Sequence, residues 1–98
     1  MSLSLIIPVY NEESQIISTI NKLTKLKRNI KDFEILIIND FSTDSSEKLI
    51  KKFSNKKKFI KFYNNKFKGL GSAIQTGILK SKKKYVCIFM SDMSDSLI

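Results

Sequence analysis

The chain has 98 residues, of which 42% are hydrophobic, and this length fits one compact domain or a part of a larger one. No apolar run approaches the roughly 20 residues that a bilayer-spanning helix needs. The first ten residues also lack the basic start and the cleavage site of a signal peptide. Because the single cysteine, Cys87, stands in an apolar run, the composition predicts a reducing, cytoplasmic setting.

The net charge of +9 is unevenly distributed, with 13 lysines and no acidic residue between Lys48 and Ser91. This stretch has no arginine and no recognised nucleic-acid motif, so we expect no nucleic-acid partner. Attraction to anionic lipid headgroups or to a phosphorylated substrate is one interpretation. A solvated lysine-rich face that keeps the protein soluble is the interpretation that we favour.

The first predicted strand is the apolar run Leu3–Val9, which contains Pro8 and has the continuous character of a strand buried in a parallel sheet. Asn11 is predicted to cap the next helix, with Glu12 and Glu13 in a first turn where acids complement the helix dipole. The apolar positions of this helix follow i, i+3, i+4, i+7 spacing: Ile16, Ile17, Ile20, Leu23 and Leu26.

The second predicted strand is Phe33–Asn39, and the capping-box sequence DSSE then starts a helix at Asp44. That helix is expected to bury Leu49, Ile50 and Phe53. The third strand, Phe59–Tyr63, alternates in polarity, which places it nearer an edge of the sheet.

A third helix is predicted in GLGSAIQTGILKS, with Gly77 allowing close packing on the sheet. Its expected apolar face consists of Leu70, Ala73, Ile74 and Ile78. The fourth strand is Tyr85–Met90, in which we expect Cys87 to be buried and, without any histidine in the chain, not to act as a nucleophile. The order β-α-β-α-β-α-β predicts a Rossmann-like three-layer α/β/α fold, with a mainly parallel sheet of about four strands and three right-handed crossover helices.

Polar stretches follow all four predicted strands: PVYNEE, NDFSTD, NNKFKGLGS and SDMSD. Ligands of open parallel α/β sheets bind at the carboxyl ends of the strands, so we expect the site there. Tyr10 can lie against a planar base, and Asp40 can accept hydrogen bonds from a base N–H. The Pro8 backbone can line the base pocket. Glu12 can serve the ligand or the helix start, and Gly71 can admit a ligand close to the backbone or merely open a helix.

Asp92 is the candidate metal ligand, because Mg²⁺ and Mn²⁺ take oxygen ligands and commonly bridge a carboxylate to a diphosphate. Asp95 is a second candidate ligand for the same ion. An acid at that position could instead stabilise the start of a following helix.

Four of these stretches together resemble glycosyltransferase family 2, of the nucleotide-diphospho-sugar transferase (GT-A) fold. SLIIPVYNEE is similar to the opening strand and loop of the family, and ILIINDFSTDSS to its V-x-D/N-D-G-S-x-D signature. NKFKGLGSAIQTGI is similar to its N-x-G-x-G-x-A-x-x-x-G segment. IFMSDMSDS resembles the region of its D-x-D metal motif, most closely in the polyprenyl-phosphate (dolichol-phosphate) sugar transferase branch.

The resemblance implies that residues 1–98 are the N-terminal nucleotide-sugar-binding part of a glycosyltransferase domain, ending after the metal-motif region. It implies a UDP- or GDP-linked sugar, Mg²⁺ or Mn²⁺, and inverting hexosyl transfer to an acceptor such as a polyprenyl phosphate at the inner face of the membrane, or a saccharide. The nucleotide-binding residues that it implies are Pro8, Tyr10, Glu12, Asp40, Gly71 and Asp92.

Two residues depart from the family pattern. Phe41 stands where the signature has glycine, which makes a positive φ there costly, and Met90 occupies the first position of the D-x-D motif. From the resemblance, we expect the half of the family domain that carries the acceptor site and the catalytic base to lie outside these 98 residues. We therefore expect no catalytic residue and no turnover in this fragment. The alternative is a non-catalytic α/β domain that self-associates into a homo-oligomer through an exposed sheet edge.

Overall fold

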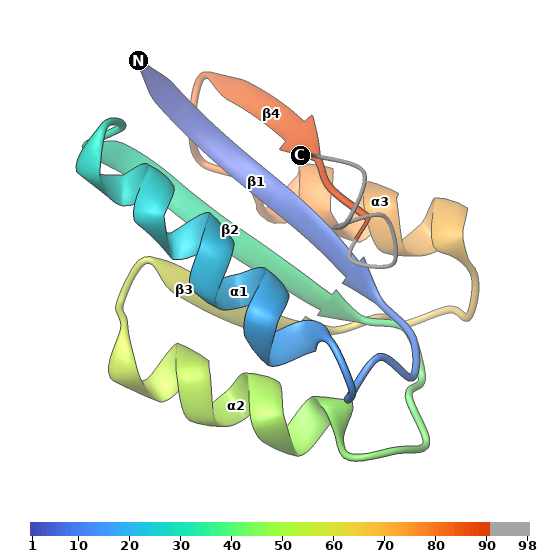
Figure 1. Ribbon diagram of the computed structural model, residues 1–98. Helices are drawn as coiled ribbons and strands as arrows, with labels where there is room; N and C mark the ends of the chain where they lie inside the picture. The colour runs from blue at the N-terminus through green and yellow to red at the C-terminus, as the bar shows by residue number, and fades with distance from the viewer. Residues whose placement is uncertain (91–98) are drawn as a thin grey trace.

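Four parallel strands form one sheet in the computed structural model, which describes residues 1–90 (Figure 1). The order across the sheet is β3-β2-β1-β4, and the strands are β1 (Ser2–Val9), β2 (Asp32–Asn39), β3 (Ile60–Asn64) and β4 (Tyr85–Ile88). The helices are α1 (Ile16–Thr24), the short 3-10 helix η1 (Lys25–Arg28), α2 (Ser46–Lys56) and α3 (Leu70–Lys80). The predicted Rossmann-like α/β fold is confirmed.

The central strands β1 and β2 are buried on both faces, which explains their continuous apolar sequences. One face carries Leu5, Ile7, Ile35 and Ile37, and it packs against Ile16 and Ile20 of α1 and Ile50 of α2. The other face carries Ile6, Leu36 and Ile38, which pack with Ala73 of α3. Figure 1 shows α1 and α2 on one side of the sheet and α3 on the other, so the layers are α/β/α.

The edge strands differ from the prediction in two respects, both in β4. β3 lies at one edge, as its alternating sequence predicted. β4 occupies the other edge of the described sheet and ends at Ile88 rather than Met90. Cys87 is exposed, so the prediction that it is buried was wrong. Within residues 1–90, β4 pairs only with β1, and all four of its side chains remain open to solvent.

Two helix starts also differ from the prediction. Gln15 stands at the N-cap of α1, so Asn11 does not cap this helix, and Glu12 and Glu13 precede its first turn rather than lying in it. The N-cap of α2 is Ser45, one residue later than predicted. Asp44 Oδ1 nevertheless accepts a hydrogen bond from the Ser46 N–H at 2.9 Å. The loops that follow β1 and β2 are therefore longer than the helix-capping rules predicted.

Close packing of α3 on β1 depends on Gly77. A Cβ added at this glycine would lie 2.4 Å from Cγ2 and 2.9 Å from Cδ1 of the buried Ile6. The prediction of close packing is confirmed. The predicted apolar face is only partly correct, because Leu70 and Ile78 are exposed while Ala73 and Gly77 are buried.

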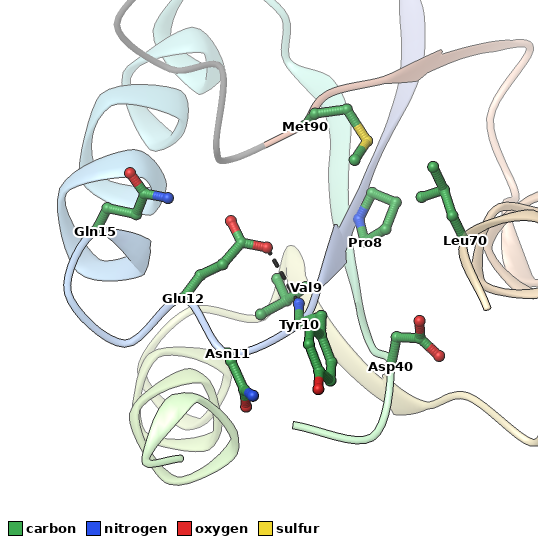
Figure 2. A pocket seen from close by; sticks show the side chains of 9 residues that line it. All are labelled: Pro8, Val9, Tyr10, Asn11, Glu12, Gln15, Asp40, Leu70 and Met90. Atoms are coloured by element: carbon green, nitrogen blue, oxygen red, sulfur yellow. Dashed lines mark hydrogen bonds between the residues drawn. The ribbon is translucent and has the colours of Figure 1, made fainter. Parts of the chain in front are cut away.

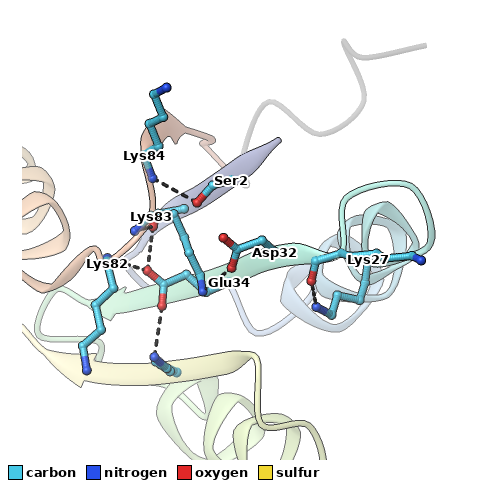
Figure 3. Close-up of polar contacts among 10 residues, drawn as sticks. Ser2, Lys27, Asp32, Glu34, Lys82, Lys83 and Lys84 are labelled. Carbon is cyan, nitrogen blue, oxygen red and sulfur yellow. Dashed lines mark hydrogen bonds and ion pairs between the residues drawn. The ribbon is translucent and has the colours of Figure 1, made fainter.

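A buried carboxylate fixes the turn between α3 and β4. Glu34 is 2% exposed and accepts hydrogen bonds from Ser4 Oγ at 2.6 Å, Lys82 N–H at 2.8 Å and Lys61 Nζ at 3.0 Å (Figure 3). Burial by itself would raise the pKa of Glu34, but these three donors outweigh that effect, and the pKa lies below its ordinary value. Three strands are therefore tied together where β4 begins.

We expect Gly77→Ala to lower the free energy of unfolding by about 1–3 kcal/mol, the usual cost of overpacking a core. Gly71→Ala in the same helix is the matched control, because an added Cβ there meets nothing within 4 Å. This control should be neutral or stabilising by up to about 1 kcal/mol. Urea unfolding measures both, and an unchanged stability of Gly77→Ala would show that α3 does not need this close approach.

We expect Glu34→Ala to cost about 1–3 kcal/mol at pH 7, because it leaves the buried Ser4 hydroxyl, the Lys82 amide and the Lys61 ammonium without their acceptor. Since the folded-state pKa lies below the ordinary value of 4.5, this stabilisation is present above that pH and is lost as the pH falls through the lower folded-state value. The stability gap between the wild type and Glu34→Gln should accordingly shrink below pH 4.5. A pH-independent gap would contradict this reasoning.

The exposed Glu47–Lys51 pair provides the control for that experiment. Its two side chains lie one helical turn apart, with their charged atoms at 3.0 Å. Glu47→Gln should change the stability at pH 7 by less than about 1 kcal/mol, since exposed ion pairs contribute little.

Candidate functional site

A pocket of about 390 Å³ lies at the carboxyl ends of β1 and β2 (Figure 2). β1 and the loop after it supply most of its wall, Asp40 enters directly after β2, and Leu70 comes from the start of α3. Its nine lining residues are Pro8, Val9, Tyr10, Asn11, Glu12, Gln15, Asp40, Leu70 and Met90. The site therefore lies at the edge of the sheet where the topology predicts it.

Four of the predicted binding residues line this pocket together: Pro8, Tyr10, Glu12 and Asp40. Gly71 is not among the lining residues; it lies in the first turn of α3, where the space beside it is open. Asp92 and Asp95 lie outside the described residues, so their predicted roles stay predictions. The chain segment that leads to them reaches the pocket through Met90.

The Asp40 carboxylate connects the end of β2 to the start of α3. Its Oδ1 accepts hydrogen bonds from Gly69 N–H at 2.9 Å and from Asn65 Nδ2 at 3.0 Å, and its Oδ2 lies 3.2 Å from Gly69 N. The Asp40 amide in turn donates to Val9 O at 2.7 Å. An ionised carboxylate has about four acceptor positions, so Oδ2 keeps capacity for a further donor from a ligand.

Asn65 organises the loop between β3 and α3, and the sequence reasoning did not single it out. Its side chain is 5% exposed and donates to Asp40 Oδ1, while its Oδ1 accepts the hydroxyls of Ser72 and Thr76, both at 3.1 Å. The signal in the sequence was its position directly after a strand, one residue beyond Asn64. Its burial could not be read from that position alone.

The loops after β1 and β2 are held to each other through Asn11. This residue has φ 48°, and its Oδ1 accepts hydrogen bonds from the amides of Thr43 at 2.6 Å and Asp44 at 3.2 Å. Its own amide donates to Ser42 Oγ at 3.0 Å. Asparagine tolerates the left-handed backbone conformation better than most residues, which explains the choice of side chain here.

Acidic residues complete this connection between the loops. The Glu13 amide donates to Asp44 Oδ2 at 3.2 Å, and the Ser45 amide donates to Glu13 Oε2 at 3.2 Å. Partial burial would raise the pKa of Asp44, but hydrogen bonds from Ser46 and the Glu13 amide hold it below its ordinary value. The Glu12 amide donates to Ser46 Oγ at 2.9 Å. Most of the carboxylates gathered in these loops thus hold the pocket wall in place.

Phe41 adopts φ 60°, the conformation for which the family signature has glycine. The expectation that a positive φ would be strained at this position applies, since such a conformation costs of order 1–3 kcal/mol for a non-glycine residue. The Asn39 side chain supports the turn by accepting the Ser42 amide at 3.3 Å. The neighbouring Asp40 is thereby held in the pocket wall despite the strain.

A cation lies beside the pocket. Lys68 Nζ is 5.7 Å from the centre of the Tyr10 ring, and Tyr10 is 47% exposed. The carboxylates of Glu12 and Asp40 are the acidic groups of the lining. Within residues 1–90, no three His, Cys, Asp or Glu side chains come together in a way that could hold a metal ion. The aromatic face and the carboxylates of the described wall suit a planar, polar ligand.

A parallel α/β sheet with helices on both faces and a pocket at the carboxyl ends of its strands defines a Rossmann-like α/β domain. The family model for glycosyl transferase family 2 matches residues 4–96, and the chain belongs to this family. It is 34% identical over 101 residues to the dolichyl-phosphate beta-glucosyltransferase of Dictyostelium discoideum, covering 92% of this chain and 30% of that protein.

Solved structures of glycosyltransferases have the same fold. S. aureus TarS in complex with UDP superposes with a TM-score of 0.82 at 28% identity, over 94% of this chain and 28% of that one. The mannosyltransferase PcManGT from Pyrobaculum calidifontis, solved with GDP-Man and Mn²⁺, gives a TM-score of 0.80 at 17% identity, over 92% of this chain and 27% of that one.

The chain spans less than a third of the length of the curated relatives that it matches. Among the helices of the described part, none has the length and hydropathy that crossing a membrane requires.

Asn11→Gly should lower the free energy of unfolding by about 1–2 kcal/mol, because it keeps the backbone conformation accessible but removes the acceptor of two amides. Asn11→Asp keeps an acceptor oxygen and should remain close to the wild type. Hydrogen exchange of the Thr43 and Asp44 amides reports the same difference locally. Equal protection of these amides in the wild type and Asn11→Gly would contradict the role assigned to this side chain.

Proposed function

We propose that this chain binds a UDP- or GDP-linked sugar and forms the nucleotide-binding part of a glycosyltransferase. The observation that carries the proposal is that Tyr10 and Asp40 meet in one pocket at the strand ends of a family 2 chain. The UDP complex of TarS, a structural neighbour, supports the choice of ligand class. The GDP-Man complex of PcManGT leaves the base open between uracil and guanine.

The binding roles follow from the chemistry of the pocket wall. The exposed Tyr10 ring offers a face for the base, and Asp40 Oδ2 can accept a base N–H. Pro8 is buried and lines the pocket, and the Glu12 carboxylate accepts the Tyr10 N–H at 3.1 Å. Gly71 lies in the first turn of α3, where a ligand phosphate can approach the backbone.

Metal binding is assigned to Asp92, with Asp95 as a second candidate ligand for Mg²⁺ or Mn²⁺. The Mn²⁺ in the PcManGT complex supports this assignment. Such an ion would offset negative charge on the leaving nucleotide diphosphate. Met90, which lines the pocket, precedes Asp92 by two residues.

Transfer also requires a base that deprotonates the acceptor hydroxyl. We assign that base, and the acceptor site for a polyprenyl phosphate or a saccharide, to a part of the enzyme beyond this chain. The reaction is then inverting hexosyl transfer, carried out by the whole enzyme in the cytoplasm or at the inner face of the membrane. The 98-residue chain alone should bind without turnover.

Self-association through β4 is the second candidate function. The four β4 side chains are exposed, and Tyr85 is 54% exposed. An open edge of this kind can pair with another chain. Light scattering separates the candidates, because a monodisperse species of 11.3 kDa would contradict a homo-oligomer.

Calorimetric titration with UDP-glucose, UDP-GlcNAc and GDP-mannose in the presence of Mn²⁺ tests the binding proposal. We expect Tyr10→Ala to lower the affinity for the nucleotide by about 5- to 150-fold. This range corresponds to the roughly 1–3 kcal/mol that stacking a base on an aromatic ring contributes. Tyr85→Ala is the matched control, since its ring is similarly exposed but lies on β4, outside the pocket lining. No heat from any of the three sugars would overturn the proposal, and equal losses in both variants would contradict the role of Tyr10.

A further inference from the structure

Positive charge gathers at the end of the molecule opposite the pocket. This basic end comprises the last turns of η1, α2 and α3 together with the loops that lead into β2, β3 and β4. All strands run in one direction and every helix returns antiparallel to them. These segments therefore lie together at the end of the sheet where the strands begin (Figure 1). Its basic residues are Lys25, Lys27, Arg28, Lys31, Lys56, Lys57, Lys58, Lys80, Lys82, Lys83 and Lys84.

The basic end carries the whole net charge of the chain. Against its eleven basic residues stand two acids, Asp32 and Glu34, so its net charge is +9, equal to that of all 98 residues. Both acids already form ion pairs. Lys83 Nζ lies 2.6 Å from Asp32 Oδ1, and Lys61 Nζ lies 3.0 Å from Glu34 Oε1. The charges of the remaining residues, which include those around the pocket, sum to zero.

Helix stabilisation explains only part of this pattern. Lys56 and Lys80 lie in the last turns of α2 and α3, where a cation complements the helix dipole. Lys31, Lys57 and Lys58 lie in exposed loop positions beyond the helices. Concentrating so many like charges at one end costs stability through repulsion, and no ion pair within the described chain compensates for it at these three lysines.

We propose that the basic end docks on an anionic membrane surface. Ten of its eleven cations are lysines, whose mobile point charges suit a diffuse layer of phosphate and carboxylate headgroups. Sequence-reading nucleic-acid sites depend instead on the arginine fork or on aromatic stacking. The charges lie on three separate loops and helix ends, so a broad surface can engage them together.

The position of the basic end sets the orientation of the docked chain. The pocket opens at the carboxyl ends of the strands, the end of the sheet opposite the docked surface. In the docked chain it therefore faces water, where soluble nucleotide sugars are available. The lysines accordingly do not deliver a lipid phosphate to this pocket, so docking in this orientation favours the saccharide acceptor over a polyprenyl phosphate in the same membrane. Docking involves none of the pocket-lining residues, so it is independent of the proposed nucleotide binding.

Co-sedimentation with phosphatidylcholine vesicles containing 30% phosphatidylserine tests the docking, with pure phosphatidylcholine vesicles as the neutral comparison. We expect binding to the anionic vesicles at 100 mM salt, weakening as salt is raised, and none to the neutral vesicles. The triple variant Lys31→Glu/Lys57→Glu/Lys58→Glu should reduce the partition coefficient at least about tenfold.

The matched control is Lys48→Glu/Lys52→Glu/Lys66→Glu, which has the same net charge but changes exposed lysines outside the basic end. It should keep most of the vesicle binding, and circular dichroism should confirm that both variants fold. Equal losses in the two triple variants, or no vesicle binding by the wild type, would overturn the proposal. Tighter binding to a 20-base-pair RNA duplex than to the anionic vesicles would overturn it in favour of a nucleic-acid partner.

Discussion

The pairing of β1 with β2 is the constraint on which the rest of the structure depends. The two strands stay in register over their full length, from Ser2 opposite Asp32 to Val9 opposite Asn39. This register buries alternate isoleucines on both faces, which gives α1 and α2 one apolar surface and α3 the other. It also ends both strands at the same level, so Tyr10 and Asp40 emerge side by side and the Asp40 amide can reach Val9 O. The position of the pocket thus follows from strand register, and the loops after the strands then supply much of its wall.

The elements that the sequence predicts well are those determined by burial. The runs Leu3–Val9 and Phe33–Asn39 are apolar without interruption because both faces of each strand are covered, and their bounds differ from β1 and β2 by a single residue. β4 has a similar apolar sequence but is exposed, because periodicity alone cannot distinguish an uncovered strand from a buried one. Leu70 and Ile78 were misplaced for a related reason: the small residues Ala73 and Gly77, rather than the large ones, face the sheet.

The position of the candidate site could be predicted from the sequence, but the hydrogen bonds that connect its loops could not. The parallel topology places four predicted residues at the carboxyl ends of β1 and β2, and the structure brings them together in one pocket: Pro8, Tyr10, Glu12 and Asp40. Capping rules assigned Asn11 and Asp44 to helix starts within their own segments. Asn11 bonds instead to the other loop, and Asp44 bonds both to that loop, over a separation of more than 30 residues, and to Ser46 at the start of its own helix. Pairings across such a distance depend on tertiary approach, which local sequence patterns do not encode.

The contact between Gly77 and Ile6 has a consequence for how this family can diversify. Ala73 lies one turn before Gly77, so the face of α3 toward the sheet carries small residues and the helix packs close to the strands. This close packing sets the position at which Leu70 lines the pocket. Neither Ile6 nor Gly77 touches the pocket, yet a change in the volume of either one would raise or tilt the helix that forms one of its walls. The shape of the pocket therefore depends partly on a contact in the core. Two relatives with identical pocket-lining residues can still differ in the ligands that their pockets accommodate.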